Sequence, residues 1–463
     1  MFDLHPLIIL LIGMATVVLM ITLLRLNAFI ALLSSAIIVS LLAPGGLPEK
    51  ISRVAKEFGS TAGGIGIVIA LAVVIGKCMM DSGAADRIVR SFLSLLGEKR
   101  AATALMASGY VLSVPVFFDT VFYLLVPLAR SMHKRTKKHY LKYIMAIAAG
   151  GVVTHSLVPP TPGPLSMADN FDIDVGLLIM VGALVAVPAS LVGMLFSGLV
   201  NGRMNLPMRP LAGGMSEPEP VEEHRLPHLL PSVLPIVLPV LLVSSNTIVS
   251  AVAKGAAEGS RMEKLAGLAA VFGDVNLAML LSAGIAMWVL KSKRRLSNKE
   301  LAKVVEVSLM SGGMIILITA AGGAFGKMLD AAGIGPAVEN LLRADAGQQA
   351  SGLVLLALGV VIALVLKIAQ GSCTVAMIAT SAMLAPMIAS ADSLGYNRVY
   401  LATAIGGASM IGSWMNDSGF WIFAKMAGLT EGETIKTWTP LLAIVGLAAV
   451  VVSFLLATIF PMG

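Results

Sequence analysis

The sequence predicts an all-α polytopic membrane protein that contains an inverted repeat. Hydrophobic residue types make up 57% of the 463 residues and charged types only 13%, whereas an ordinary soluble domain carries roughly 25% charged residues. Apolar runs close to the length of about 20 residues that crosses a bilayer recur along the chain, at 7–24, 177–200, 229–243, 268–290 and 441–460. This chain has too few charged side chains to cover so many apolar segments in a soluble protein.

The first apolar run is expected to be a retained helix rather than a signal peptide. Asp3 and His5 stand where a signal peptide carries basic residues, and the chain continues after Leu24 into a second apolar run without a small-residue cleavage site. The only two cysteines, Cys78 and Cys373, form neither a metal-ligand spacing nor a disulfide framework. No metal and no cofactor is therefore expected.

The basic residues indicate the topology. Basic clusters at 134–138 and 291–295 lie in short loops between apolar runs, which is the positive-inside pattern of membrane proteins rather than a nucleic-acid-binding face. Both loops are expected on the cytoplasmic side of a cell (inner) membrane, and both termini on the outer, periplasmic side. An even number of crossings fits between the loops, at about 143–165, 174–200, 228–250 and 267–290.

The two halves of the sequence resemble each other, which indicates an internal repeat. Gly76-Lys77 in the first half has a counterpart in Gly326-Lys327, about 250 residues later. The loops of the first copy are basic and those of the second are mostly acidic, so we expect the copies to lie in opposite orientations. The predicted division is a first half at 1–200, a polar cytoplasmic linker at 201–227 and a second half at 228–463.

Each half is expected to contain a re-entrant hairpin and a broken helix. The hairpins are predicted at 101–130 and 353–388, since 101–130 joins two basic ends that one straight crossing would place on opposite sides. The broken helices are predicted at 143–165 and 398–421, where proline, glycine and hydroxyl residues interrupt apolar sequence. Inverted repeats with broken helices are typical of secondary transporters.

Polar residues at these interruptions form the candidate substrate site. A helix that begins inside the bilayer offers unpaired N–H groups and a partial positive charge to an anion, so the expected substrate is a small organic acid. The residues expected to bind it are Thr154, His155, Ser156, Thr161, Lys367, Gln370, Gly371, Ser372, Thr374, Asn416, Asp417 and Ser418.

Ionisable residues within apolar stretches carry the charge chemistry. A bare charge there needs protonation, a partner or an ion, and histidine titrates near neutral pH, so Asp119, His155 and Asp417 are the proton-coupling candidates. Lys367 is expected to neutralise a substrate carboxylate. Simpler roles stay open: Asp119 as a structural partner, His155 bonded to a neighbour, Lys367 reaching an interface, and Asp417 capping the helix that starts at Ser418.

Other function classes fit the sequence less well. The chain has no Walker A pattern, so ATP-driven pumping is not expected. It also has no His/Cys cluster of the kind that binds metal or haem, and no constellation that indicates an enzyme. Two alternatives stay open: a passive organic-anion channel or receptor that uses the same clefts, and sodium coupling through backbone carbonyls and Asn416.

At these motifs the sequence resembles the gluconate:proton symporter (gluconate permease, GntP) family over nearly the whole chain. The resemblance is carried by the segments 76–85, 117–119, 154–164, 369–372 and 416–421, in that order. It implies proton-coupled uptake of gluconate or a related hydroxy-carboxylate across the cytoplasmic membrane, in a family whose substrates include sugar acids, short hydroxy acids and D-serine. It also implies a scaffold part, a transport part and a homodimer in the lipid bilayer.

The sequence departs from the family pattern at two positions. Thr161 stands where the family often has a histidine between two proline-rich pairs, and Trp414 stands where a second histidine is common, two residues before Asn416. We expect the bulk of Trp414 to narrow the cavity toward a smaller acid. Faster uptake of gluconate than of three-carbon acids by the protein in liposomes contradicts that expectation.

Overall fold

The computed structural model describes residues 5–462 except for 98–99, 116, 205, 210–222, 224–225, 254–259, 335–336, 338–347, 390–393 and 416. All regular structure within the described residues is helical, which confirms the predicted all-α fold. The helices of the first half are α1 (Pro6–Thr22), α2 (Ala28–Leu42), α3 (Leu47–Ser82), α4 (Ala84–Leu96), α5 (Ala101–Leu112), α6 (Phe118–Thr136), α7 (Tyr140–Leu157), α8 (Pro162–Phe171) and α9 (Val175–Arg203). Those of the second are α10 (Leu229–Val252), α11 (Arg261–Phe272), α12 (Val275–Arg294), α13 (Asn298–Ala331), α15 (Gln348–Gln370), α16 (Cys373–Ala389), α17 (Arg398–Ala408), α18 (Ser418–Ala427) and α19 (Glu431–Ile459).

Many of these helices have the length and composition of membrane spans. Seven segments among the described residues qualify: α3, the pair α7–α8 taken together, α9, most of α10, α12, α13 and α19. The protein is therefore a multi-pass membrane protein, as the composition predicted. The first apolar run forms only the 17-residue helix α1, which is followed by the 15-residue helix α2.

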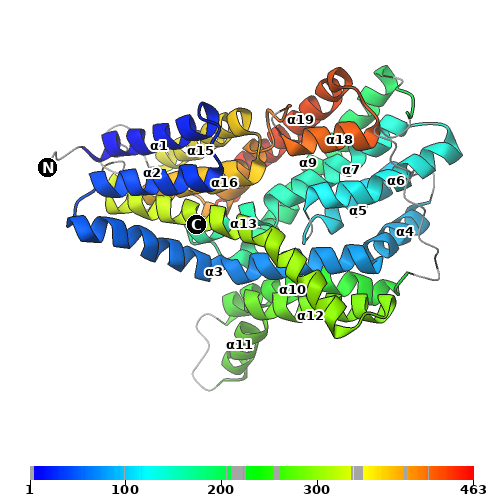
Figure 1. Ribbon diagram of the computed structural model, residues 1–463, viewed down its shortest axis with the longest axis horizontal. Helices are drawn as coiled ribbons and strands as arrows, with labels where there is room; N and C mark the ends of the chain where they lie inside the picture. Colours follow the sequence, from blue (N-terminus) through cyan, green and yellow to red (C-terminus); the bar gives the residue numbers. More distant parts are fainter. Residues whose placement is uncertain are drawn as a thin grey trace.

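The helices of the two halves follow the same order. A long helix (α3, α13) is followed by a helix pair (α5–α6, α15–α16), an interrupted helix (α7–α8, α17–α18) and a final long helix (α9, α19). In Figure 1 the pair α5–α6 lies toward one end of the molecule, beside α4, and the pair α15–α16 lies toward the other end, beside α1. Related segments at opposite ends are what an inverted repeat requires.

Glycines bring the backbones of the central helices into contact. A Cβ at Gly150 of α7 would lie 2.1 Å from the carbonyl oxygen of Met106 in α5, and a Cβ at Gly109 of α5 would lie 2.7 Å from that of Ile147. Small residues allow such close approach between membrane helices, where van der Waals packing replaces the hydrophobic effect as the driving force. Helix α7 is thereby held in the centre of the fold.

One predicted boundary differs in the structure, and the predicted linker lies mostly outside the described residues. The fourth crossing begins at Val275 rather than at 267, because the Asp274 carboxylate accepts a hydrogen bond of 3.0 Å from the Leu277 amide and starts a new helix there. Helix α9 continues to Arg203, and most of the predicted linker 201–227 lies outside the described residues. The division into halves at this linker stays a prediction.

The glycine contact predicts the cost of a single methyl group. Gly150→Ala should destabilise the protein by about 1–3 kcal/mol, since the added Cβ overlaps a backbone atom that cannot rotate away. Gly284→Ala in α12 is the matched control, because nothing lies within 4 Å of a Cβ at that position. Thermal unfolding in detergent measures both, and equal melting temperatures for the two variants contradict the close α5–α7 contact.

Candidate functional site

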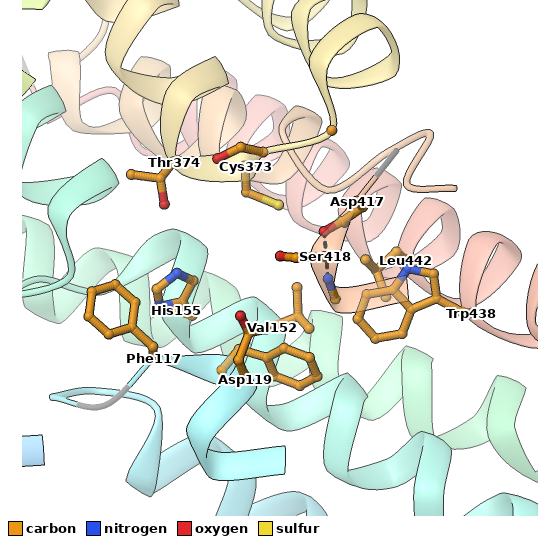
Figure 2. Close-up of a pocket in the computed structure, with 14 residues that line it drawn as sticks. Phe117, Asp119, Val152, His155, Cys373, Thr374, Asp417, Ser418, Trp438 and Leu442 are labelled. Carbon is orange, nitrogen blue, oxygen red and sulfur yellow. Dashed lines mark hydrogen bonds between the residues drawn. The ribbon is translucent and has the colours of Figure 1, made fainter. Parts of the chain in front are cut away.

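The N-terminal ends of three helices meet at one cavity inside the fold. These are the starts of α6, α16 and α18, and the sides of α7 and α19 complete the walls. The cavity has a volume of about 390 Å³. Figure 2 shows that side chains from both halves of the sequence point into it.

The first helix break separates α7 from α8. Residues 158–161 connect the two helices, and the Pro159–Pro160 peptide bond is cis. The Thr161 hydroxyl lies 2.8 Å from the carbonyl oxygens of both His155 and Val158, so it pairs with the end of α7. The first turn of α8 receives no side-chain cap from Thr161.

The second break, between α17 and α18, is held by a carboxylate. Residues 409–417 connect these helices. The Asp417 Oδ1 atom accepts a hydrogen bond of 2.9 Å from the Gly419 amide, which is the capping role that its position before Ser418 allows. A negative charge at this place also interacts favourably with the helix dipole.

A buried ion pair joins this break to the tip of the α15–α16 pair. The Nζ atom of Lys367 lies 2.7 Å from Asp417 Oδ2, and it also donates to the Gly371 carbonyl and to Cys373 Sγ at 3.3 Å. An ammonium group has three donors, so all three are directed at protein atoms. Lys367 is 0% exposed and does not line the cavity, which differs from the expected direct contact with substrate.

Asp119 is the cavity carboxylate without a partner. It lies in the first turn of α6, lines the cavity and forms no hydrogen bond or ion pair with any described residue. His155 of α7 lines the same cavity, and its Nδ1 atom is buried and has no hydrogen-bond partner there. Its ring centroid lies 5.6 Å from that of Phe117. Figure 2 shows Asp119, His155 and Ser418 around a common space.

Four aromatic rings close the cavity on the side toward which α6 and α18 run. This aromatic layer consists of Phe118, Phe122, Phe423 and Trp438, with neighbouring ring centroids between 5.1 and 5.6 Å apart. Phe118 and Trp438 line the cavity, and Phe122 and Phe423 follow on the two helices. All four are buried.

The predicted site residues divide into three groups. Those that line the cavity are Asp119, His155, Gly371, Ser372, Thr374, Asp417 and Ser418. Those that are buried beside it, without lining it, are Thr154, Ser156, Thr161 and Lys367. Asn416 and the side chain of Gln370 lie outside the described residues.

Two residues that line the cavity were not predicted from the sequence, and the predicted contribution of Trp414 to the cavity wall is not supported. Trp438 and Leu442 line the cavity from α19, at the start of the apolar run 441–460 that the composition predicts only as a membrane span. Trp414 is 46% exposed, its indole donates to the Ile368 carbonyl at 3.1 Å, and it does not line the cavity. The predicted narrowing of the cavity by Trp414 therefore has no basis in this structure.

The match to known proteins decides the family. Residues 5–459 match the family described as GntP family permease. The chain belongs to the GntP permease family. The resemblance that the motifs indicated is thereby confirmed, and the protein is a membrane transporter rather than an enzyme.

The relatives of this permease are similar over nearly their whole length. It is 32% identical to the gluconate permease of Pseudomonas aeruginosa, over 96% of this chain and 95% of that one. It is 29% identical to the low-affinity gluconate transporter of Escherichia coli, over 93% of each chain, and to the inner membrane permease YgbN of the same species, over 96% of each. Its fold is similar to that of the Alcanivorax borkumensis YdaH transporter, with a TM-score of 0.66 at 14% identity, over 95% of this chain and 99% of that one.

The cavity of the permease combines features that attract an anion with one uncompensated acid. Three helix N-termini supply N–H groups and partial positive charge, and the hydroxyls of Thr374 and Ser418 lie at the starts of two of them. The charge of Asp417 is balanced by Lys367, so Asp119 is the acidic group whose charge an anionic ligand meets.

The buried ion pair predicts a large difference between single and double substitution. Lys367→Met should destabilise the permease by about 3–5 kcal/mol, since it leaves Asp417 buried beside a side chain that cannot compensate its charge. Lys367→Met combined with Asp417→Asn should recover most of that loss. Lys77→Met is the control, because the Lys77–Asp81 pair is 44% and 33% exposed and such pairs contribute about 0–1 kcal/mol.

Thermal unfolding of the detergent-purified variants measures these differences. If Lys367→Met has the same melting temperature as the Lys77→Met control, Lys367 is not needed to compensate the charge of Asp417. A double variant that melts as low as Lys367→Met shows that the lysine stabilises the fold in another way.

Proposed function

We propose that this permease is a symporter that takes up gluconate, or a related small hydroxy-carboxylate, together with a proton. The observation that carries the proposal is the unpaired carboxylate of Asp119 in a cavity whose other features suit an anion. Relatives that match nearly the whole chain are a gluconate permease and a gluconate transporter, which supports the substrate class. We propose the cytoplasmic (inner) membrane as the location. A relative named inner membrane permease YgbN, which matches 96% of this chain, supports it.

The substrate carboxylate is proposed to bind at the starts of α16 and α18. Gly371, Ser372 and Thr374 line the cavity at the first of these helices, and Ser418 and Gly419 line it at the second. N–H groups at a helix start are ready donors for a carboxylate, and the nearby hydroxyls of Thr374 and Ser418 suit the hydroxyl groups of a sugar acid. Lys367 acts on the substrate only through Asp417 in this arrangement.

Asp119 is the proposed proton carrier. A second anion in a cavity of about 390 Å³ is costly as long as Asp119 is charged, because like charges in a poorly hydrated site repel. Protonation of Asp119 removes that cost, so substrate and proton bind together. Asp417 is a weaker candidate, since its carboxylate already accepts hydrogen bonds from Lys367, Ser413 and the Gly419 amide. His155, with its unpaired Nδ1, is the proposed second group on the proton route.

Uptake into liposomes separates the coupling modes. An inward proton gradient should accelerate gluconate uptake by the wild-type protein, and the apparent affinity should fall as the outside pH rises, by up to about tenfold per unit, because binding then requires proton uptake by Asp119. A response to a sodium gradient with none to the proton gradient rejects proton coupling. Unlabelled gluconate on the far side should accelerate entry of labelled gluconate. An open channel would show no such acceleration.

Asp119→Asn tests the proton carrier. The variant should exchange gluconate across the membrane but no longer accumulate it in response to a proton gradient, since the asparagine side chain carries no titratable proton. Asp81→Asn, which removes a partly exposed carboxylate at the end of α3, should keep full coupling. Proton-driven accumulation by Asp119→Asn at the wild-type level assigns the proton to another group.

We propose a topology in which both termini lie on the outer side and the loop 134–138 lies in the cytoplasm, with a homodimer as the functional unit. The exposed residues Lys138 and Asp172 flank the α7–α8 segment. A cysteine at Lys138 should react with a membrane-impermeant maleimide only from the cytoplasmic side, and a cysteine at Asp172 only from the outside. Labelling of both cysteines from the same side contradicts a membrane crossing by α7–α8. The molecular mass of the detergent-purified protein tests whether it is a dimer.

A further inference from the structure

Trp438 connects a wall helix to the second helix break. It lies in α19, two turns after the helix begins at Glu431, and it is 1% exposed. Its indole Nε1 donates a hydrogen bond of 2.7 Å to the hydroxyl of Ser413, which is itself fully buried between α17 and α18. An indole N–H that is buried at membrane depth needs an acceptor, and Ser413 supplies it.

This contact fixes the direction of a chain of hydrogen bonds. A serine hydroxyl has one hydrogen to donate, and because the Ser413 oxygen accepts from Trp438, its hydrogen is available for Asp417 Oδ2, to which it is bonded. The same Oδ2 accepts from Lys367 at 2.7 Å. The chain thus runs from α19 through the break to the tip of the α15–α16 pair at Gly371.

The ring of Trp438 also limits the cavity. A Cβ at Gly419, in the first turn of α18, would lie 3.0 Å from the indole, so the start of α18 rests against the ring. The ring centroids of Phe118 and Phe423 lie 5.6 and 5.1 Å from that of Trp438. Trp438 therefore contacts both a substrate-facing helix start and the aromatic layer.

The first half holds its break in a different way. The residue of α9 that corresponds to Trp438, counted from the helix start, is Gly182. A Cβ there would lie 2.2 Å from the Leu157 carbonyl oxygen, so the backbone of α9 packs directly on the end of α7. At this place the first half has a glycine against the backbone, whereas the second has a side chain that reaches the break through a hydrogen bond.

We propose that Trp438 is a positioning residue for the substrate site: through Ser413 it holds Asp417 and Lys367, and with them the starts of α16 and α18, at the spacing that binds the substrate carboxylate. The identity of the substrate in this proposal rests on the proposed function. Trp438 acts through its N–H group and not through contact with the carboxylate. Loss of the N–H group weakens substrate binding and loosens the hairpin tip at Gly371 and Cys373.

The test compares Trp438→Phe with Trp421→Phe. Both changes keep an aromatic ring and remove an indole N–H, but Trp421 donates to the Met415 carbonyl and does not line the cavity. Trp438→Phe should raise the KM for gluconate about fivefold, the effect of one hydrogen bond in a charged network, with the maximal rate nearly unchanged. Trp421→Phe should leave KM at the wild-type value.

Ser413→Ala serves as the second variant, because it removes the same link without changing the ring. The double variant Trp438→Phe/Ser413→Ala should show no larger rise in KM than either single variant, since both break one chain. Additive effects of the two changes, or a wild-type KM in Trp438→Phe, overturn the proposal.

A readout independent of the substrate is the reaction of Cys373 with N-ethylmaleimide. Cys78 is fully buried and the sequence has no third cysteine, so Cys373→Ser protein supplies the background rate. Trp438→Phe and Ser413→Ala should each raise the Cys373 labelling rate several-fold, because Lys367 then holds the hairpin tip less firmly. Failure of the wild type to take up gluconate rejects the proposed substrate, whereas unchanged labelling in both variants rejects the role of Trp438.

Discussion

A helix that is interrupted inside a membrane leaves backbone N–H and C=O groups that water cannot reach, and each needs a partner within the protein. The rest of the site follows from how the permease meets this constraint. At the first break a threonine hydroxyl pairs with the end of α7. At the second, a carboxylate pairs with the start of α18, and its charge then requires Lys367. The two breaks occupy corresponding places in the helix order, but among the described residues only the second has a charged side chain, Asp417, in an ion pair.

This difference divides the tasks of the two halves. The second half supplies a neutral ion pair, which positions two helix starts without adding net charge to the cavity. The first half supplies Asp119 and His155, whose side chains face the cavity without such a pair. A buried salt bridge is weak evidence for stability on its own, so its value here lies in the geometry that it fixes. The unpaired Asp119 carboxylate is thereby separate from the Lys367–Asp417 ion pair at the second break.

Much of the fold could be predicted from the sequence, because its causes are local. Apolar length determines the spans, and proline, glycine and hydroxyl clusters mark where α7 and α17 end. The pairing within the site could not be predicted in the same way. Lys367 and Asp417 are 50 residues apart, and nothing in either segment states that they meet. Trp438 lies between Thr437 and Thr439 near the start of a helix with the composition of a membrane span, and nothing there indicates its contact with Ser413, 25 residues away.

The aromatic layer has a consequence for leakage. Between Phe122 and Phe423 the cavity ends in stacked hydrocarbon rings that offer no donor or acceptor to a passing ion. A hydrated sugar-acid anion would have to shed its water before entering such a layer, at a cost of many times the thermal energy. The rings of one half meet those of the other through apolar contacts. The apolar layer therefore opposes passage of a hydrated anion beyond this end of the cavity.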